Sequence, residues 1–330
     1  MISRGTVAIV MLMATAAGHP VLGQDTHVLV ITGLGGDPEF REKFSEWGGT
    51  LVEAAGEKFA IPVENIIYLS EDPATDPRIQ GRSTRENVAE AFTTLASNSR
   101  PGDYIFVVLI GHGSYTNEES RFNLPGPDLT AKDFGLHLDQ LSERRVAFAN
   151  LASASGEFVK ALSGAGRAIV TATRTGRERN ETVFGGYFID ALSGETADLD
   201  KDGRVSLWEA FEFARTEVTR EYATSNRIAT EHAVLDDNGD GEGSTELVDA
   251  ADGALARTMY LAADPAAARA TDDPELIALY EQKADVERRI EELRELRGLI
   301  EQDRYDSDLE ELLIELALTN RAIQGQEVER

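Results

Sequence analysis

The chain has 330 residues, and its 32 Lys and Arg against 59 Asp and Glu give a net charge of −27. Such a charge opposes sequence-independent binding to nucleic acid or to an anionic membrane surface, so we expect neither as a partner. The sequence contains no cysteine, which excludes disulfides, thiolate metal sites and a cysteine nucleophile.

The first 23 residues have the pattern of a secretory signal peptide. Arg4 precedes an apolar run from Val7 to Ala17, and Val21 and Gly23 stand at positions −3 and −1 of a cleavage site after Gly23. A membrane anchor is the alternative, but it needs about 20 apolar residues, and this run stops at His19-Pro20. We therefore expect removal of residues 1–23, export to the periplasm or the medium, and no membrane insertion.

Strand-like and helix-like patterns alternate over the next part of the chain, residues 24–194. The first helix is expected to begin at Asp37 and Pro38, and the second at a capping box formed by Ser83 and Glu86. This alternation predicts an α/β fold with a mainly parallel sheet covered by helices on both faces. Five apolar segments are the predicted strands: 27–32, 65–69, 104–110, 146–151 and 168–173.

Two short motifs follow neighbouring strands of this predicted sheet. Gly111-His112-Gly113 ends the third strand, and Ser153-Ala154-Ser155-Gly156 ends the fourth. Because ligands bind at the carboxyl ends of parallel strands, we expect His112 and the Ser153 hydroxyl to lie close together, as a base and a nucleophile do. Gly113 would offer its amide to an oxyanion. In the alternative interpretation His112 is structural, and Ser153 is only a small residue that fits a tight turn.

The order of these motifs resembles that of the caspase-like cysteine proteases, particularly the legumain branch and its bacterial relatives. In that family a strand ending His-Gly-Ser carries the catalytic histidine, and the next ends Cys-x-Ser-Gly with the nucleophile; this chain has His112-Gly113-Ser114 and Ser153-Ala154-Ser155-Gly156. The resemblance covers about residues 26–192 and implies a caspase-like fold. From Gly33 followed by Phe40-Arg41, it also implies that Arg41 lines the substrate pocket.

The departure from the family is Ser153, which stands where the family has cysteine. A hydroxyl is much less acidic than a thiol and usually needs an oriented base. We therefore expect a catalytically impaired homologue that binds a peptide or protein partner in the same cleft. The alternative is an active serine-dependent peptidase or esterase that uses Ser153 and His112. A third hypothesis is a calcium-stabilised scaffold.

Residues 195–262 are expected to extend this domain with a calcium loop. Residues 198–209 match the twelve-residue calcium motif, with acids at positions 1, 3, 5 and 12, glycine at position 6 and a main-chain carbonyl at position 7. A solvated acidic turn is the alternative. The predicted Ca²⁺ ligands are Asp198, Asp200, Asp202, Arg204 and Glu209, with Glu209 at the start of a helix over 207–222.

A second acidic run repeats only the first half of this pattern. Asp236, Asn238 and Asp240 occupy positions 1, 3 and 5, but position 12 is Leu247, so the closing carboxylate is missing. An Asx-rich turn would explain these residues equally well. They are the remaining candidate Ca²⁺ ligands.

The last segment, residues 263–330, has helical periodicity. Apolar residues recur at spacings of three and four from Leu276 to Ile300, and again from Leu309 to Ile323 after the run 305–308. This pattern predicts two antiparallel helices that form a coiled-coil hairpin, which offers a surface for self-association or for a partner. Lys283 and Arg297 fall in the first seam and should weaken it or fix its register.

Overall fold

The computed structural model of the chain describes residues 24–194, 196–199, 204–247, 251–261 and 302–328, with a few residues between 278 and 293. The signal peptide expected over residues 1–23 lies outside the described residues. So do Asp200 and Asp202 of the first acidic loop.

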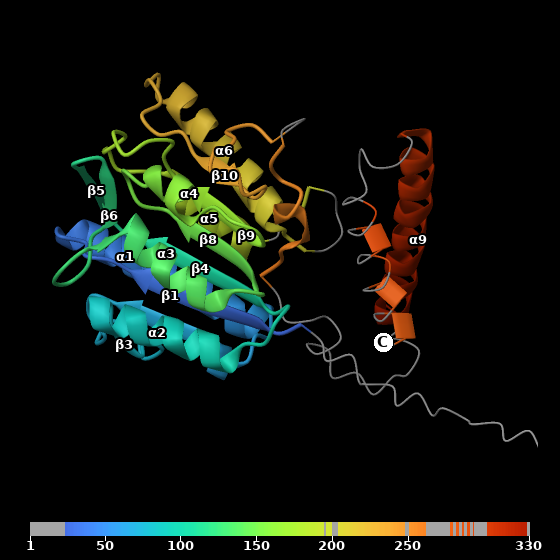
Figure 1. Ribbon diagram of the computed structural model, residues 1–330, viewed down its shortest axis with the longest axis horizontal. Helices are drawn as coiled ribbons and strands as arrows, with labels where there is room; N and C mark the ends of the chain where they lie inside the picture. Colours follow the sequence, from blue (N-terminus) through green and yellow to red (C-terminus); the bar gives the residue numbers. More distant parts are fainter. Residues whose placement is uncertain are drawn as a thin grey trace, which may run out of the picture.

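A seven-stranded sheet forms the centre of the fold (Figure 1). Its strands stand in the order β10-β9-β8-β4-β1-β2-β3, and every neighbouring pair is parallel except β10 with β9. The predicted α/β fold with a mainly parallel sheet is thus confirmed. The strands are β1 (Thr26–Thr32), β2 (Ile66–Ser70), β3 (Gly81–Arg82), β4 (Tyr104–Ile110), β8 (Arg145–Asn150), β9 (Arg167–Thr171) and β10 (Val234–Asp236).

Helices cover both faces of the sheet, because alternate residues of the buried strands point to opposite sides. Val28 and Val30 of β1 belong to one apolar cluster, which includes α1 (Pro38–Glu53), α5 (Phe184–Ser193) and α6 (Leu207–Thr224). Leu29 and Ile31 belong to the other, which includes α2 (Arg85–Asn98), α3 (Ala131–Leu138) and α4 (Glu157–Leu162). Short turns complete the connections at Ala54–Lys58, Val63–Asn65, Asp139–Leu141 and Ala256–Thr258.

The expected cap of α2 is wrong by one residue. Thr84 is the N-cap, and its side chain accepts a hydrogen bond from the Asn87 amide at 3.3 Å. Ser83 is fully buried and donates its own amide to the Ser70 carbonyl at 2.8 Å, beside the end of β2. Pairing with the strand therefore takes Ser83 away from the helix terminus.

A second, smaller sheet follows the histidine motif. Its order is β5-β6-β7, both pairs are antiparallel, and the strands are β5 (Gly113–Thr116), β6 (Glu119–Phe122) and β7 (Leu129–Thr130). These strands are only two to four residues long and were not predicted. They carry the chain from the end of β4 to the start of α3.

The C-terminal helix α9 spans Gln302–Val328. Val286, Ile290 and Leu293 share an apolar cluster with Tyr305 and Leu312. α9 includes the run 305–308, so this helix begins before the second apolar repeat at Leu309. The coiled-coil hairpin itself remains a prediction, since much of its first predicted helix lies outside the described residues.

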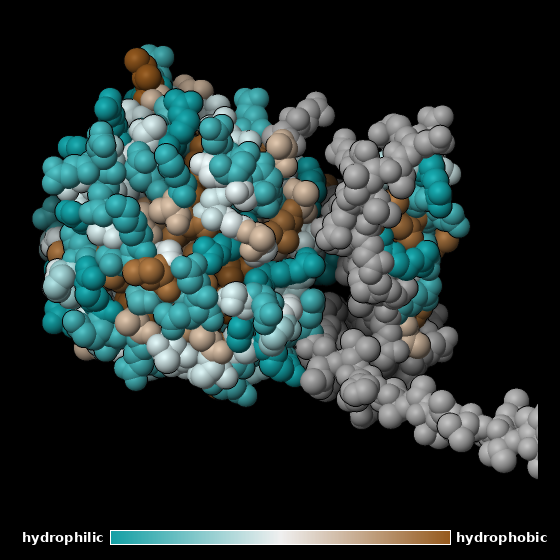
Figure 2. Space-filling view, in the orientation of Figure 1, coloured by the Kyte–Doolittle hydropathy of each residue, from teal (hydrophilic) through white to brown (hydrophobic). Residues whose placement is uncertain are grey.

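The part of the chain that the structure describes contains no helix long and apolar enough to cross a membrane. The face of the molecule in Figure 2 is largely hydrophilic, with apolar residues scattered over it. This surface agrees with the strongly acidic composition.

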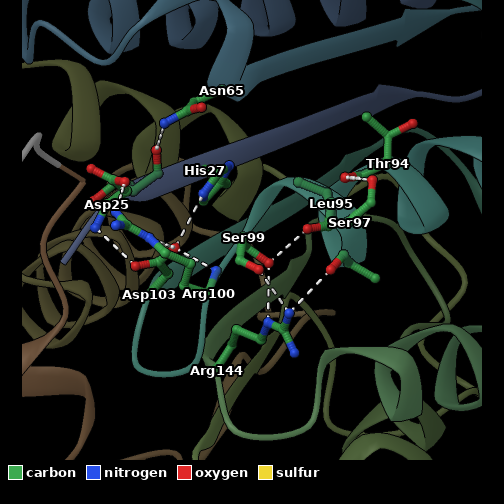
Figure 3. Close-up of polar contacts among 12 residues, drawn as sticks. Asp25, His27, Asn65, Thr94, Leu95, Ser97, Ser99, Arg100, Asp103 and Arg144 are labelled. Carbon is green, nitrogen blue, oxygen red and sulfur yellow. Dashed lines mark hydrogen bonds and ion pairs between the residues drawn. The ribbon is translucent and has the colours of Figure 1, made fainter. Parts of the chain in front are cut away.

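A polar cluster lies at the amino-terminal edge of β1 and β4 (Figure 3). His27 is 2 % exposed, and its Nε2 lies 3.5 Å from Oδ2 of Asp103. Asp103 also accepts hydrogen bonds from the amides of Asp25, at 3.1 Å, and Arg100, at 2.7 Å. Arg100 in turn pairs with Asp25. Nearby, Arg144 closes the end of α2 by donating to the Ser99 carbonyl at 2.8 Å.

This cluster predicts a loss of stability in mild acid. Burial lowers the pKa of His27 and outweighs the opposing charges of Asp103 and Asp25. The unfolded chain therefore binds a proton below about pH 6.5 that the folded chain resists, so the free energy of unfolding falls as pH drops through this range. Thermal denaturation should show a falling Tm, by about 2–4 °C for each kcal/mol lost. The slope should be smaller in His27→Gln; an unchanged slope would remove His27 as a cause.

Candidate functional site

The carboxyl ends of β1, β4 and β8 meet at one edge of the sheet. From β1 the chain passes to β2 on one side and then returns to β4 on the other, so the β1/β4 boundary is a topological switch point. Gly33 follows β1 directly, His112 lies two residues beyond β4, and Ser153 lies three residues beyond β8. Parallel pairing therefore brings the two motifs to the same edge of the sheet.

Ser153 lies against the backbone of Gly113. Its Oγ is 3.4 Å from the Gly113 amide, which donates to it, and 3.5 Å from the Gly113 carbonyl, which accepts from it. The approach requires glycine, because a Cβ on residue 113 would lie only 2.1 Å from the Ser153 carbonyl oxygen. Ser153 is 5 % exposed. The structure thus brings Gly113 and Ser153 together.

The turn after Ser153 is held by the loop that follows β9. Ala154 has a φ of +53°, in the left-handed region, and its amide donates to the Glu178 carbonyl at 2.7 Å. The amides of Ser155 and Gly156 both donate to Oγ1 of Thr173, at 2.8 and 3.1 Å. Ser155 therefore has a structural role in holding the turn.

His112 is half-buried between aromatic rings. Its ring lies edge-on to Phe40, with centroids 4.6 Å apart, and to Phe44 at 5.0 Å. Burial lowers the pKa of His112, against smaller opposing effects of the Glu181 charge and the Gly35 backbone. The imidazole is thus neutral at pH 7 and able to accept a proton. Among the described residues no hydrogen bond joins it to Ser153.

Glu181 is the carboxylate whose charge has the largest effect on the pKa of His112, but it forms an ion pair with Lys43. Oε1 of Glu181 lies 2.5 Å from Nζ of Lys43, and Lys43 also lies 4.8 Å from the Trp47 ring. No described carboxylate makes a hydrogen bond to the imidazole. Sequence reasoning missed Glu181, because nothing in its spacing marks it as a neighbour of the histidine.

Arg41 lies in the first turn of α1 and contacts both the β1–α1 loop and the residue that follows β2. Its Nε pairs with Oε1 of Glu71, directly after β2, and its Nη2 donates to the Gly36 carbonyl at 3.2 Å. The other oxygen of Glu71 accepts from the Gly35 amide at 3.0 Å. These contacts direct Arg41 toward β2, which lies on the opposite side of β1 from β4. The structure does not join Arg41 by a hydrogen bond to His112 or Ser153.

The loop after β9 packs against the turn that follows Ser153 and carries three arginines. Arg174, Arg177 and Arg179 are exposed, and Arg179 donates to the Tyr115 carbonyl at 2.9 Å. Within the described residues the guanidinium groups of Arg174 and Arg177 form no ion pair with a carboxylate. The Glu178 carboxylate is occupied by backbone amides, including that of Arg174 at 3.2 Å. A locally cationic rim thus lies on a strongly acidic protein.

In the described part of the first acidic loop, the Glu209 carboxylate accepts hydrogen bonds from residues on both sides of the gap. Its Oε1 accepts the Leu199 amide at 2.9 Å, and its Oε2 accepts the amide and hydroxyl of Ser206, the N-cap of α6, at 2.8 and 2.7 Å. Glu209 is 3 % exposed, and Asp198 is half-buried. The guanidinium of Arg204 lies 3.9 Å from the Tyr260 ring. Glu209 therefore occupies the first turn of α6, as the sequence predicts.

The second acidic run forms a tight turn after β10. Asp236 accepts the Gly239 amide at 3.2 Å, Asn238 accepts the Asp240 amide at 2.8 Å, and Asp240 accepts the Glu242 amide at 2.7 Å. As the side chains stand, no three His, Asp or Glu groups within the described residues enclose a metal position. This observation does not include Asp200 and Asp202, which lie outside the described residues.

Comparison with protein-family models gives no match for this chain. Comparison with curated proteins likewise finds no significantly similar sequence. Function therefore has to be argued from the residues and their geometry.

Proposed function

We propose that the chain is an exported, caspase- or legumain-like protease homologue that binds a peptide without efficiently cleaving it. The proposed cleft lies at the carboxyl ends of β1, β4 and β8, and calcium at the loop 198–209 stabilises the domain. His112, Ser153 and Gly113 are the site residues, with Arg41 as a candidate pocket residue.

The observation that carries the proposal is the environment of Ser153. Its hydroxyl hydrogen-bonds to the Gly113 backbone, and His112 has neither a hydrogen bond to Ser153 nor a carboxylate to orient it among the described residues. An alkoxide forms readily only when an oriented base takes the proton. A thiol in the same position would need less assistance, because it is more acidic.

The charge around Ser153 indicates which peptides the cleft would favour. Arg174 and Arg177 are exposed, and their guanidinium groups form no ion pair within the described residues, so an acidic peptide could pair with them. Charge complementarity of this kind gives specificity and faster association, and it weakens as salt is added. The half-buried ring of Phe40, which lies edge-on to His112, offers an apolar contact to the peptide.

We expect the wild-type protein to bind a fluorescent Asp-rich peptide and to leave it intact. Fluorescence anisotropy measures binding, and mass spectrometry of the same sample measures cleavage. Replacing Asp by Asn in the peptide should weaken binding by about tenfold or more, because the ion pairs are lost. Ser153→Ala should bind the acidic peptide as tightly as the wild type does.

Three outcomes would contradict this proposal. Cleavage by the wild type that disappears in Ser153→Ala would establish the serine-dependent hydrolase. Cleavage that persists in Ser153→Ala would indicate a different site or a contaminant. Equal, weak binding of the Asp and Asn peptides would contradict recognition by the arginines.

Calcium binding at the first loop has a separate test. Glu209 is buried against Leu199 and Ser206, so calcium would find the closing carboxylate already positioned. Saturating calcium at about 100 times Kd should add about 2.7 kcal/mol to the free energy of unfolding, which thermal denaturation detects. Glu209→Gln should remove the part of the calcium-dependent increment that the first loop contributes, whereas Glu217→Gln, the same change further along α6, should retain the full increment. Equal increments in both variants would contradict the first-loop site.

A further inference from the structure

The second acidic loop contains a buried oxygen without a partner. Asp236 is 1 % exposed; its Oδ1 accepts the Gly239 amide, while its Oδ2 is buried and has no hydrogen-bond partner. An unsatisfied buried polar atom is destabilising, and native structures seldom leave a carboxylate oxygen in this state. A ligand that bears positive charge would satisfy it.

A carboxylate from outside the loop is held against the same turn. Asp252 accepts the Asp237 amide at 3.2 Å through Oδ1 and the Ser244 hydroxyl at 2.5 Å through Oδ2. The negative charges of Asp236 and Asp240 lie near enough to act on the Asp252 carboxylate. None of these three carboxylates forms an ion pair with a cationic side chain in the described part of the chain. Within the described residues, no cationic side chain therefore offsets the repulsion among these three carboxylates.

We infer that this cluster is a second calcium site in which Asp252 supplies the carboxylate that Leu247 cannot provide at position 12. The other ligands are the side chains of Asp236, Asn238 and Asp240 and the main-chain carbonyl of Glu242 at position 7. Because the three carboxylates do not yet enclose a metal position, calcium has to draw Asp252 away from Ser244. The inference is independent of peptide binding and of the first calcium loop.

The donor set favours calcium over other divalent cations. All of the proposed ligands are oxygen atoms, and they mix carboxylates, an amide and a main-chain carbonyl, as calcium sites do. Neither cysteine nor histidine is present among them, which disfavours zinc and copper. Magnesium demands a more regular octahedron and retains its water more strongly.

The site would also fix the segment that follows Asp252. The Asp237 carboxylate accepts the amides of Gly253 and Ala256, at 2.7 and 2.8 Å, and the Met259 carbonyl accepts the Leu207 amide at 2.8 Å. Residues 251–261 thus connect the second acidic loop to the start of α6, beside the first loop. Calcium at Asp252 would stabilise this connection.

The experiment is calorimetric titration of chelator-treated full-length protein with CaCl₂, using Glu209→Gln to remove the first site. We expect two ions bound by the wild type, one by Glu209→Gln, and at least about tenfold weaker binding of that remaining ion in Glu209→Gln/Asp252→Asn. The matched control is Glu209→Gln/Glu246→Gln, which removes an exposed carboxylate of the same segment that is not a proposed ligand. It should bind the remaining ion normally.

Thermal denaturation separates a ligand role of Asp252 from a merely structural one. Asp252→Asn keeps the size of the side chain and removes one of three like charges, so without calcium the Tm should be unchanged or higher. A structural role alone predicts a lower Tm without calcium and an unchanged increment with it, and this result would overturn the inference. So would normal affinity in Glu209→Gln/Asp252→Asn. One ion in the wild type and none in Glu209→Gln would refute the second site and leave the first intact.

Discussion

Ser153→Cys is expected to convert an unreactive protein into one that a thiol-directed alkylating agent labels at a single position. The wild type has no cysteine and cannot be labelled in this way. The new thiol would lie beside the Gly113 backbone, and the preceding residue, His112, has a lowered pKa that leaves its imidazole able to take a proton. The resulting thiolate is the reactive form. Mass spectrometry over a time course measures the rate.

The matched control is Ser97→Cys, which places a thiol at an exposed position near the end of α2. The thiol at residue 153 should react about tenfold faster or more, despite its burial, because an activated cysteine has a lowered pKa. Adding His112→Ala should abolish this advantage. A thiol at residue 153 that reacts no faster than that at residue 97, or a rate unaffected by His112→Ala, would show that His112 is not placed to act as a base.

Gly113→Ala is expected to destabilise the protein and to disturb the turn at Ser153. The added methyl would lie 2.1 Å from the Ser153 carbonyl oxygen and 3.1 Å from that of Arg121, and backbone atoms cannot move aside as a flexible side chain does. Overpacking of this kind costs about 1–3 kcal/mol, occasionally more. Urea denaturation should show this loss of unfolding free energy, and binding of the acidic peptide should weaken because the turn at Ser153 is displaced.

Gly56→Ala provides the comparison for this prediction. Its added Cβ meets only the Cδ1 atom of Ile66, at 3.8 Å, which is an ordinary contact. The position lies in the helical turn after α1, where alanine is favoured over glycine by about 1 kcal/mol. Gly56→Ala should therefore be neutral or stabilising. A Gly113→Ala variant as stable as this one would contradict the close approach of residues 113 and 153.

Local patterns in the sequence determined the sheet domain in outline. The apolar run Tyr104–Ile110 is β4 to the residue, and Pro38 begins α1 as expected. The His112 and Ser153 motifs meet at one edge because parallel strands put their carboxyl ends on the same side. Glu209 stands in the first turn of α6, since Ser206 and Glu209 have the spacing of a capping box. Each of these features depends on residues a few positions apart.

Contacts between distant residues decided the remaining features, and only the tertiary structure shows them. The α5 N-terminus is capped by Glu231, whose two oxygens accept the amides of Val183 and Phe184 at 3.0 Å from almost fifty residues away. Lys43 holds Glu181, and Ser244 and Asp237 hold Asp252. Such pairs leave no periodicity in the sequence, because their geometry depends on how the sheet order and the loops bring separate segments together. Whether His112 has an orienting carboxylate, and whether the second acidic loop has a closing one, was therefore decided by packing and not by any local pattern.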